Sequence, residues 1–560
     1  MRAIFKRSEG PGARRLAILV AAAGFALAGC TRTDQTASTA AGTTARHSWT
    51  TPGVLRFATL GDPDTLNPLL GEFQVDVDIS MFWAGYLFNY NDRNQFVPEL
   101  ATVVPTLANR GIAKDGRTIT YHLRRGVRWQ DGAPFDGDDV VFTWRAVMNP
   151  HNNVQTRSGY DLIAAIGQPD KYTLVVHLKK PYAPFVATFC TMSSTVYPVL
   201  PKHLLAQYPN INQVPYNSKP VGTGPFIVQE WHRGETIRMI ANPHYWRGAP
   251  KLREVQYRSI PDDNTLATSM RTHELDLWYN ASATDYAVAS KFDGTHALLT
   301  PFTQYSRIGF NVQRPIMADL AVRRAIAFAT DRKRLIETVT YGVDLLGEGD
   351  QPAFSWAHDP NLPSLPFEPG KARAILDAAG WTPGPDGIRT KNGARLHVQF
   401  ATTTGNAIGS RVAVQLQSAW KDVGIELEVK TYPSSLMFAN YSAGGILQGG
   451  KFDVEISSWV NGTDPDDSTN FMCDQIPPNG QNSYRFCSRE LDAQERIALG
   501  SYDQTVRKAA YAKIQAILVD QLPMVTMWFQ RRFDVVSDDL HGYKPAQAVS
   551  PFWNTWEYQI

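Results

Sequence analysis

The fold of this chain is decided by residues 118–150, TITYHLRRGVRWQDGAPFDGDDVVFTWRAVMNP. Apolar and polar residues alternate over 118–124, which is the period-2 pattern of a half-buried strand. Asp131-Gly132 marks a turn. Asp136 then stands at a helix N-cap position, and apolar residues recur at helical spacing until Asn149-Pro150 ends the helix. The stretch therefore predicts a strand, a turn and a helix of an α/β domain.

The same stretch carries a family resemblance. Residues 123–143 closely resemble the signature of the extracytoplasmic solute-binding proteins of ABC importers, in the oligopeptide/dipeptide/nickel class called solute-binding protein family 5. The string departs from this signature at Asp136-Gly137, where the family more often has a hydroxyl residue and alanine, but Asp136 can still cap a helix. Residues 221–226 and 242–250 resemble two further motifs, so the resemblance covers nearly the whole mature chain.

The resemblance implies an α/β, type II periplasmic-binding-protein fold, with two lobes around a ligand cleft and an additional inserted subdomain. The predicted segments are a lipoprotein signal peptide at 1–29, a flexible tether at 30–52, lobe I at 53–90, 216–300 and 525–560, its inserted subdomain at 91–215, and lobe II at 305–520.

The N-terminus has the pattern of an export signal. A basic segment ends at Arg14-Arg15, and an apolar run too short to span a membrane follows over 16–27. Leu27-Ala28-Gly29-Cys30 then resembles a bacterial lipobox, in which Cys30 is lipidated; the alternative is an ordinary cleaved signal with an incidental cysteine. Residues 31–52 are rich in Thr, Ala, Ser and Gln and predict a tether. We expect an exported protein, periplasmic or on the outer face of the cell membrane, anchored by lipid.

Composition is that of a globular protein, with 43% hydrophobic and 19% charged residues in 560. The formal net charge is +2, and it becomes −2 when residues 1–29, with five basic residues and one acidic residue, are set aside. A nearly neutral mature chain gives no electrostatic reason to expect nucleic acid as a partner. A monomer is expected.

Periodicity predicts further elements. Helices are expected over 319–337, 371–379 and 406–422. The last is followed by an alternating strand pattern at 425–429, and such helix-then-strand units predict a largely parallel sheet. The charged residues of the first helix are expected to face solvent: Arg323, Arg324, Asp331, Arg332 and Lys333. Gly222-x-Gly224 lacks the third glycine of a dinucleotide loop, so a glycine turn is the preferred interpretation.

Catalytic and metal-binding patterns are missing from the sequence. The twelve His residues are scattered without metal-ligand spacing, so neither a metal nor a cofactor is expected. Ser418-x-x-Lys421 matches a pattern of penicillin-recognising enzymes but has no partner motif, which disfavours a hydrolase. Cys473 and Cys487, 14 positions apart in a loop of an exported protein, predict a disulfide. Cys190 is left over beside apolar residues and is interpreted as a buried thiol.

The segment 459–466, Trp-Val-Asn-Gly-Thr-Asp-Pro-Asp, resembles the family's Trp…Asp-Pro loop at the ligand cleft. The resemblance implies that, in peptide-binding members, a carboxylate shortly after the Trp holds the peptide's ammonium group. Asn461-Gly462 stand at about that place here, so Asp464 either substitutes for it or only caps a turn. The predicted ligand-binding residues are Trp459, Asn461 and Asp464, with Tyr305, Asn311, Tyr279 and Trp528 as weaker candidates.

The resemblance implies that the protein is the lipid-anchored binding component of an ABC importer and not an enzyme. It would capture a peptide or peptide-like solute between two lobes and deliver it to permease and ATPase subunits. The alternatives are a non-peptide solute (an oligosaccharide, an opine or a metal chelate), a sensory lipoprotein, and a lipid-anchored hydrolase.

Overall fold

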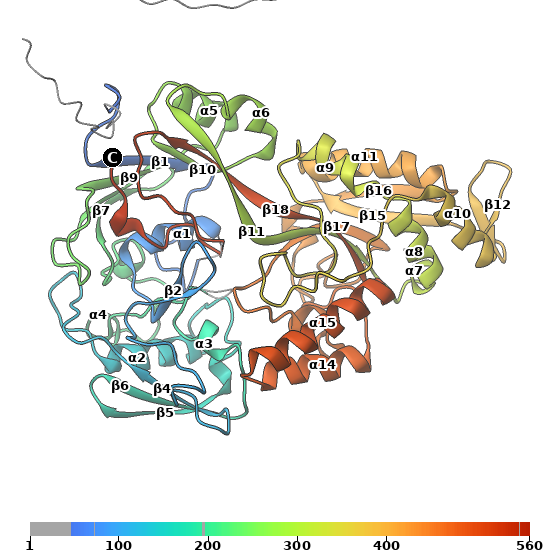
Figure 1. Cartoon of the computed structure of the whole chain (residues 1–560). Coiled ribbons are helices and arrows are strands. Elements are labelled where there is room, and N and C mark those ends of the chain that lie inside the picture. Colours follow the sequence, from blue (N-terminus) through green and yellow to red (C-terminus); the bar gives the residue numbers. More distant parts are fainter. Residues whose placement is uncertain (1–45, 72, 193–195, 548) are drawn as a thin grey trace, which may run out of the picture. The chain divides into compact units, whose positions relative to one another are not determined.

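The computed structural model describes residues 46–71, 73–192, 196–547 and 549–560 (Figure 1). The predicted signal peptide, the lipidation site at Cys30 and most of the predicted tether lie outside these described residues.

Within the described residues, the main sheet has ten strands in the order β16-β15-β17-β11-β18-β10-β1-β9-β8-β7. Their bounds are β1 Val54–Thr59, β7 Phe226–His232, β8 Thr236–Ala241, β9 Glu254–Ser259, β10 Leu277–Ala281, β11 Thr295–Phe310, β15 His397–Thr403, β16 Glu426–Tyr432, β17 Val454–Val460 and β18 Met524–Ser537. Smaller sheets are formed by β2 Phe88–Tyr90 with β3 Phe96–Pro98, by β4 Thr118–His122, β6 Thr173–Leu178 and β5 Ile163–Asp170, and by β12 Thr382–Pro383, β13 Arg389–Lys391 and β14 Ala394–Arg395.

Two long strands, β11 and β18, join the two lobes (Figure 1). They pair with each other along most of their length. At one end β18 pairs with β10, and at the other end β11 pairs with β17. Separate apolar cores lie on the two sides, one around Phe57 and Trp83 and the other around Val398 and Trp420. The fold is thus the two-lobed α/β architecture that the sequence predicted.

The strand directions differ from the prediction of a largely parallel sheet. Four neighbouring pairs are parallel, namely β16-β15, β15-β17, β10-β1 and β1-β9. The other five pairs are antiparallel. The prediction fails because the two crossing strands run against their neighbours and because β7, β8 and β9 follow one another as hairpins.

The 118–150 stretch forms the predicted strand, turn and helix, as β4 and α2 Gly137–Met148. Asp136 caps the helix, since its carboxylate accepts a hydrogen bond of 3.0 Å from the Asp138 backbone N–H. Asp139 lies in the first turn of α2, where its carboxylate accepts from the Trp129 indole at 3.1 Å and from the Lys202 backbone N–H at 2.9 Å. Through Asp139, helix α2 is therefore bonded both to the loop that follows β4 and to the segment at Lys202.

The glycines at 222 and 224 form a turn against the end of α1 Gln74–Trp83, as predicted. A Cβ atom at Gly222 or Gly224 would collide with the Trp83 backbone. The Gln130 side chain fills the remaining hydrogen-bonding positions, donating to the Phe226 carbonyl at 2.7 Å and accepting from the Gly222 N–H at 2.9 Å. Close backbone approach explains why glycine is needed at both positions.

The prediction of a single helix at 319–337 is wrong, because this segment forms two helices, α8 Leu320–Phe328 and α9 Arg332–Val339. Asp331 caps α9 by accepting a hydrogen bond of 3.0 Å from the Arg334 N–H. Arg332 is buried and pairs with Glu348 at 2.6 Å, and Arg323 is buried against the Leu522 carbonyl at 2.9 Å. The expected solvation is therefore wrong for both arginines.

The remaining predicted helices are confirmed. The predicted 371–379 is α10 Pro369–Ala378, and the predicted 406–422 is α11 Ala407–Lys421, capped by Asn406. The other helices of eight or more residues in the described segments are α5 Asp263–Arg271, α14 Arg489–Gly500 and α15 Gln504–Gln521. Short helices are α3 Phe185–Thr188, α4 Lys202–Leu205, α6 Tyr286–Ala289, α7 Pro315–Ala318, α12 Ser434–Met437 and α13 Ser468–Phe471. None of the described helices is both long enough and apolar enough to cross a membrane.

The last residues of the predicted tether pack onto the protein. The His47 backbone N–H donates to Asp539 at 3.0 Å, and the Thr50 hydroxyl also bonds to that carboxylate. Trp49 stacks on His273 with ring centroids 3.9 Å apart. The tether prediction is therefore wrong at its end, because an aromatic residue and two polar residues find partners on the folded body.

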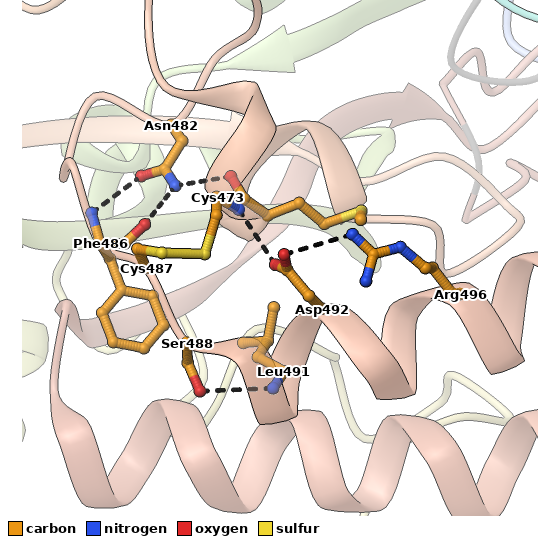
Figure 2. Close-up of a disulfide and its surroundings, with 9 residues drawn as sticks. Cys473, Asn482, Phe486, Cys487, Ser488, Leu491, Asp492 and Arg496 are labelled. Atoms are coloured by element: carbon orange, nitrogen blue, oxygen red, sulfur yellow. Dashed lines mark hydrogen bonds and ion pairs between the residues drawn. A yellow bond between two sulfur atoms is a disulfide. The ribbon is translucent and has the colours of Figure 1, made fainter.

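The cysteines follow the predictions where the structure describes them. Cys473 and Cys487 form a disulfide beside the start of α14 (Figure 2). The Cys473 N–H donates to Asp492 of that helix at 3.0 Å, which fixes the loop to the helix (Figure 2). Cys190 is a buried free thiol, and burial raises its pKa to about 12. The predicted limits of the lobes stay a prediction.

Candidate functional site

The 459–466 segment begins in the last two residues of β17 and continues as a loop. Because β17 pairs with β11, Trp459 lies opposite Tyr305. Asn461 fixes the loop: its side-chain amide donates to the Asp350 carbonyl at 2.7 Å, and its backbone N–H donates to the Thr303 carbonyl at 3.2 Å. Asn461 is buried, so its role in the structure is to hold the loop.

Two cavities adjoin this loop, and each is lined from both the 91–215 segment and the 305–520 segment. The first, called here the Trp459 cavity, has a volume of about 420 Å³. Its lining includes Thr156, Tyr182, Trp459, Gly462, Asp464 and Asp466. The second, called the Trp356 cavity, has a volume of about 400 Å³. Its lining includes Tyr90, Phe96, Val186, Trp356, Asp464 and Arg507. Asp464 thus lies at the boundary of the two cavities.

Asp464 is paired with an arginine of the protein itself. Its two carboxylate oxygens accept hydrogen bonds from the two terminal nitrogens of Arg507, at 2.6 and 2.7 Å. The side chains of Arg507 and Asp464 are only 7% and 13% exposed. Burial opposes the charge of Arg507, but the Asp464 carboxylate outweighs this effect and the pKa of Arg507 is raised. The Arg507 guanidinium also lies over the Trp356 ring at 5.2 Å.

Asp464 also has the turn role that the sequence left open. One of its oxygens accepts a hydrogen bond of 3.2 Å from the Asp466 backbone N–H. The Asp464 carboxylate therefore has three protein donors, one from the loop and two from α15. This arrangement satisfies the carboxylate without any ligand.

A second contact of the loop joins the 91–215 segment to the 305–520 segment. The Tyr182 hydroxyl donates to Asp466 at 2.9 Å, and Asp466 also accepts from the Ser468 hydroxyl at 2.6 Å. Nearby, the Tyr502 hydroxyl donates to the Tyr182 carbonyl at 2.9 Å, and the Ala183 N–H donates to the Leu499 carbonyl at 2.7 Å. These bonds hold the loop against the facing segment.

Buried carboxyl groups lie next to the loop. Asp350, Asp467 and Glu495 are at most 1% exposed. Burial, together with the neighbouring carboxyl groups, raises the pKa of Asp467 well above its usual range, and burial raises the pKa of Glu495 to about 8. Among the described residues, no cluster of His, Cys, Asp and Glu has the geometry to hold a metal ion.

The other predicted ligand residues divide into two groups. Tyr305 is fully buried beside the loop, with its ring 5.9 Å from the Phe529 ring. None of Tyr305, Tyr279, Asn311 and Trp528 lines either cavity, and the last three lie away from the loop. Tyr279 packs on Phe57 and Phe552, Trp528 belongs to the core of one lobe, and the Asn311 amide donates to the Gly450 carbonyl at 3.0 Å.

Of the residues lining the two cavities, only Trp459 and Asp464 were predicted as ligand residues; Tyr182, Trp356 and Arg507 are among those that were not. Arg507 had a detectable signal. It stands three, four and seven positions before Ala510, Tyr511 and Ile514, which is the spacing of one helix face, and all four residues are buried. A charged residue on the apolar face of a predicted helix indicates a buried partner. Tyr182 and Trp356 carry no comparable local signal.

Residues 102–478 match the family described as bacterial extracellular solute-binding proteins, family 5 Middle. The chain belongs to this family. Protein XP55 of Streptomyces lividans is 31% identical over 466 residues, covering 82% of this chain and 80% of the relative. The oligopeptide-binding protein AppA of Bacillus subtilis is 27% identical over 499 residues, covering 88% and 89%. The structure of the Bacillus subtilis AppA in complex with a nonapeptide has a TM-score of 0.74 at 24% identity, covering 91% of this chain and 99% of the solved chain.

As a family 5 solute-binding protein, the chain is an extracytoplasmic binding protein of a transport system and not an enzyme. This membership confirms the predicted family and removes the hydrolase alternative based on Ser418 and Lys421.

Proposed function

We propose that this protein is the solute-capturing subunit of an ABC importer, attached to the membrane by lipid at Cys30 and acting as a monomer. It holds a peptide-sized solute at the 459–466 loop and delivers it to a permease that is driven by an ATPase. The observation that carries the proposal is the pair of cavities beside this loop. Each cavity is lined by residues of both the 91–215 segment and the 305–520 segment. The name of the AppA relative and the nonapeptide in its structure support a solute of this size.

A site with walls on both lobes couples binding to closure. A solute that touches both walls binds the closed state more tightly than the open state and shifts the population toward closure. The two crossing strands β11 and β18 supply the hinge in this proposal. Trp459 contributes a large contact area with few rotatable bonds, so the entropy cost of ordering it is small.

Native mass spectrometry tests the capture of a solute. The protein is purified without denaturation, its intact mass is compared with its mass after unfolding, and the released compound is identified. A stoichiometric small molecule supports the proposal. If no compound co-purifies, and neither peptides of two to nine residues nor sugars of two to five units change the melting temperature, the proposal fails.

Lipid attachment is tested separately in a bacterium that processes lipoproteins. Cys30→Ala is expected to move the protein from the membrane fraction to the soluble fraction, because a cleaved signal without the lipid leaves no anchor. Cys190→Ala is the matched control and is expected to stay in the membrane fraction, because this thiol is buried in the folded body. A soluble wild-type protein with an unmodified N-terminus would refute the anchor.

A further inference from the structure

The charged side chains at the Trp459 cavity already have hydrogen-bonding partners within the protein. Asp464 is held by both terminal nitrogens of Arg507. Asp466 accepts from the Tyr182 hydroxyl and from the Ser468 hydroxyl and backbone N–H. Among the described residues that line the cavity, Asp464 and Asp466 are the charged ones. This described lining contains no Lys, Arg or His. The cavity therefore offers neither an uncompensated carboxylate nor a cation.

This result bears on the charge of the solute. A free peptide carries an ammonium group and a carboxylate at neutral pH. Each of these charges needs a partner of opposite charge or several hydrogen bonds when it leaves water. An ammonium group at Asp464 would have to compete with Arg507, which is bound by two hydrogen bonds in a nearly buried site. The cavity is thus poorly matched to a free zwitterionic peptide.

The same lining is well matched to hydroxyl groups. Eight of its fifteen described residues carry a hydroxyl or an amide. Ser158, Thr469 and Asn479 are exposed at the cavity, and their side chains make no hydrogen bond to other described residues. Hydroxyl and amide groups both donate and accept, so they complement a ligand whose groups do the same.

Two aromatic side chains complete the lining, and both are half-buried. Trp459 and Tyr182 border the cavity from the two facing segments. An aromatic face packs against the C–H face of a sugar ring, while the ring's hydroxyls bond at its edge. The volume of about 420 Å³ lies in the ordinary range for small-ligand sites, which is about 300–1,000 Å³.

We propose that the solute captured at the Trp459 cavity is a neutral, hydroxyl-rich molecule of the oligosaccharide class, with a sugar ring packed on Trp459. This inference rests on the proposed function, because it concerns the same site and names the chemistry of its ligand.

The test compares two panels of ligands on the full mature protein. One panel holds neutral gluco-, xylo-, manno- and galacto-oligosaccharides of two to five units, and the other holds free peptides of two to nine residues. Melting curves find the binders, and calorimetry measures their affinity. We expect one oligosaccharide series to raise the melting temperature and the peptides to leave it unchanged. The affinity is expected to change less than twofold between 0.05 and 0.5 M salt, because a neutral ligand is not screened.

Variants place the ligand in the cavity. Trp459→Ala is expected to lower the affinity for the oligosaccharide at least tenfold. Thr469→Val and Asn479→Ala change exposed side chains without protein partners, so they test the site even if Trp459→Ala fails to fold. Each is expected to lower the affinity about fivefold by removing one hydrogen bond. Gln207→Ala, an exposed amide outside the cavity, is the matched control.

The outcomes separate this inference from the proposed function. Peptide binding that is lost in Trp459→Ala overturns the inference and supports solute capture. Oligosaccharide binding that is unchanged in all three cavity variants overturns the inference, because the sugar then binds elsewhere. If neither panel binds and no solute co-purifies, both proposals are overturned.

Discussion

At the scale of single residues, burial decides what the charged groups beside the loop can do. Asp464 was a candidate for binding a ligand ammonium, and only its position in the sequence supported that role. In the fold it is held by Arg507, a residue 43 positions away on helix α15. The sequence resemblance pointed to a loop that adjoins two cavities in the structure, but the partner that neutralises its carboxylate depends on how α15 packs.

The pair of Asp464 and Arg507 leads to a prediction about stability. Asp464→Asn is expected to lower the free energy of unfolding by about 3 kcal/mol, because it leaves the Arg507 charge buried without its partner. Arg507→Met should cost a similar amount. The double variant Asp464→Asn/Arg507→Met should recover most of the loss, since no unpaired charge remains. Urea unfolding of the four proteins measures this coupling, and additive losses in the double variant would contradict it.

Glu495 gives the stability a pH dependence. Its pKa is about 8 in the folded protein, against 4.5 when unperturbed, so folding takes up a proton between these values. The contribution is complete below pH 4.5 and is lost as the pH rises toward 8. We therefore expect the wild-type protein to lose more stability between pH 5 and 8 than Glu495→Gln does, by at least about 1 kcal/mol.

The matched control for Glu495→Gln is Glu490→Gln, an exposed carboxylate on the same helix. Its profile of unfolding free energy against pH should follow that of the wild-type protein. Denaturant unfolding at pH 5, 6.5 and 8 provides the measurement. Parallel profiles for all three proteins would show that Glu495 does not take up the proton.

At the scale of elements, the sequence predicts what is decided locally. The helix at 136–148 has its cap, its apolar spacing and its proline stop within one stretch, and it is found where predicted. The helix at 319–337 is broken by contacts that lie far away in the sequence. Thr330 accepts a hydrogen bond of 3.1 Å from the Trp420 indole, and the Arg332 side chain turns inward to Glu348. No local pattern contains these partners.

The hydrogen bonds of Asp139 can be tested by mutation. Asp139→Ala is expected to lower the free energy of unfolding by about 3 kcal/mol, because the buried Trp129 indole and the Lys202 N–H lose their acceptor. Asp138→Ala is the matched control on the same turn of the helix. Asp138 is half-exposed and pairs with the Lys202 ammonium at the surface, so its loss should cost no more than about 1 kcal/mol. Equal losses of unfolding free energy in the two variants, measured in urea, would show that the Asp139 contacts stabilise the fold no more than the Asp138 ion pair does.

At the scale of the whole molecule, two kinds of connection join the lobes. The strands β11 and β18 are covalently continuous through both sheet halves. The hydrogen bonds of Tyr182, Ala183 and Tyr502 are the other kind, because they link side chains and backbone of facing segments. Hinge motion can leave the first kind intact, while it must break the second. Under the proposed hinge motion, the facing contacts are therefore expected to set the balance between open and closed states.

Tyr182→Phe tests this balance, because it removes the hydroxyl that donates to Asp466 and keeps the aromatic ring. A hydrogen bond to a charged acceptor is worth about 1.5–3 kcal/mol, enough to change a population ratio more than tenfold. We expect the ligand-free variant to have a larger radius of gyration than the wild-type protein in small-angle X-ray scattering. The solute identified by mass spectrometry should reduce it again, since binding favours closure. Tyr208→Phe, at an exposed tyrosine, is the matched control and should scatter like the wild-type protein. Identical curves for Tyr182→Phe and wild type without ligand would mean that this contact does not hold the lobes together.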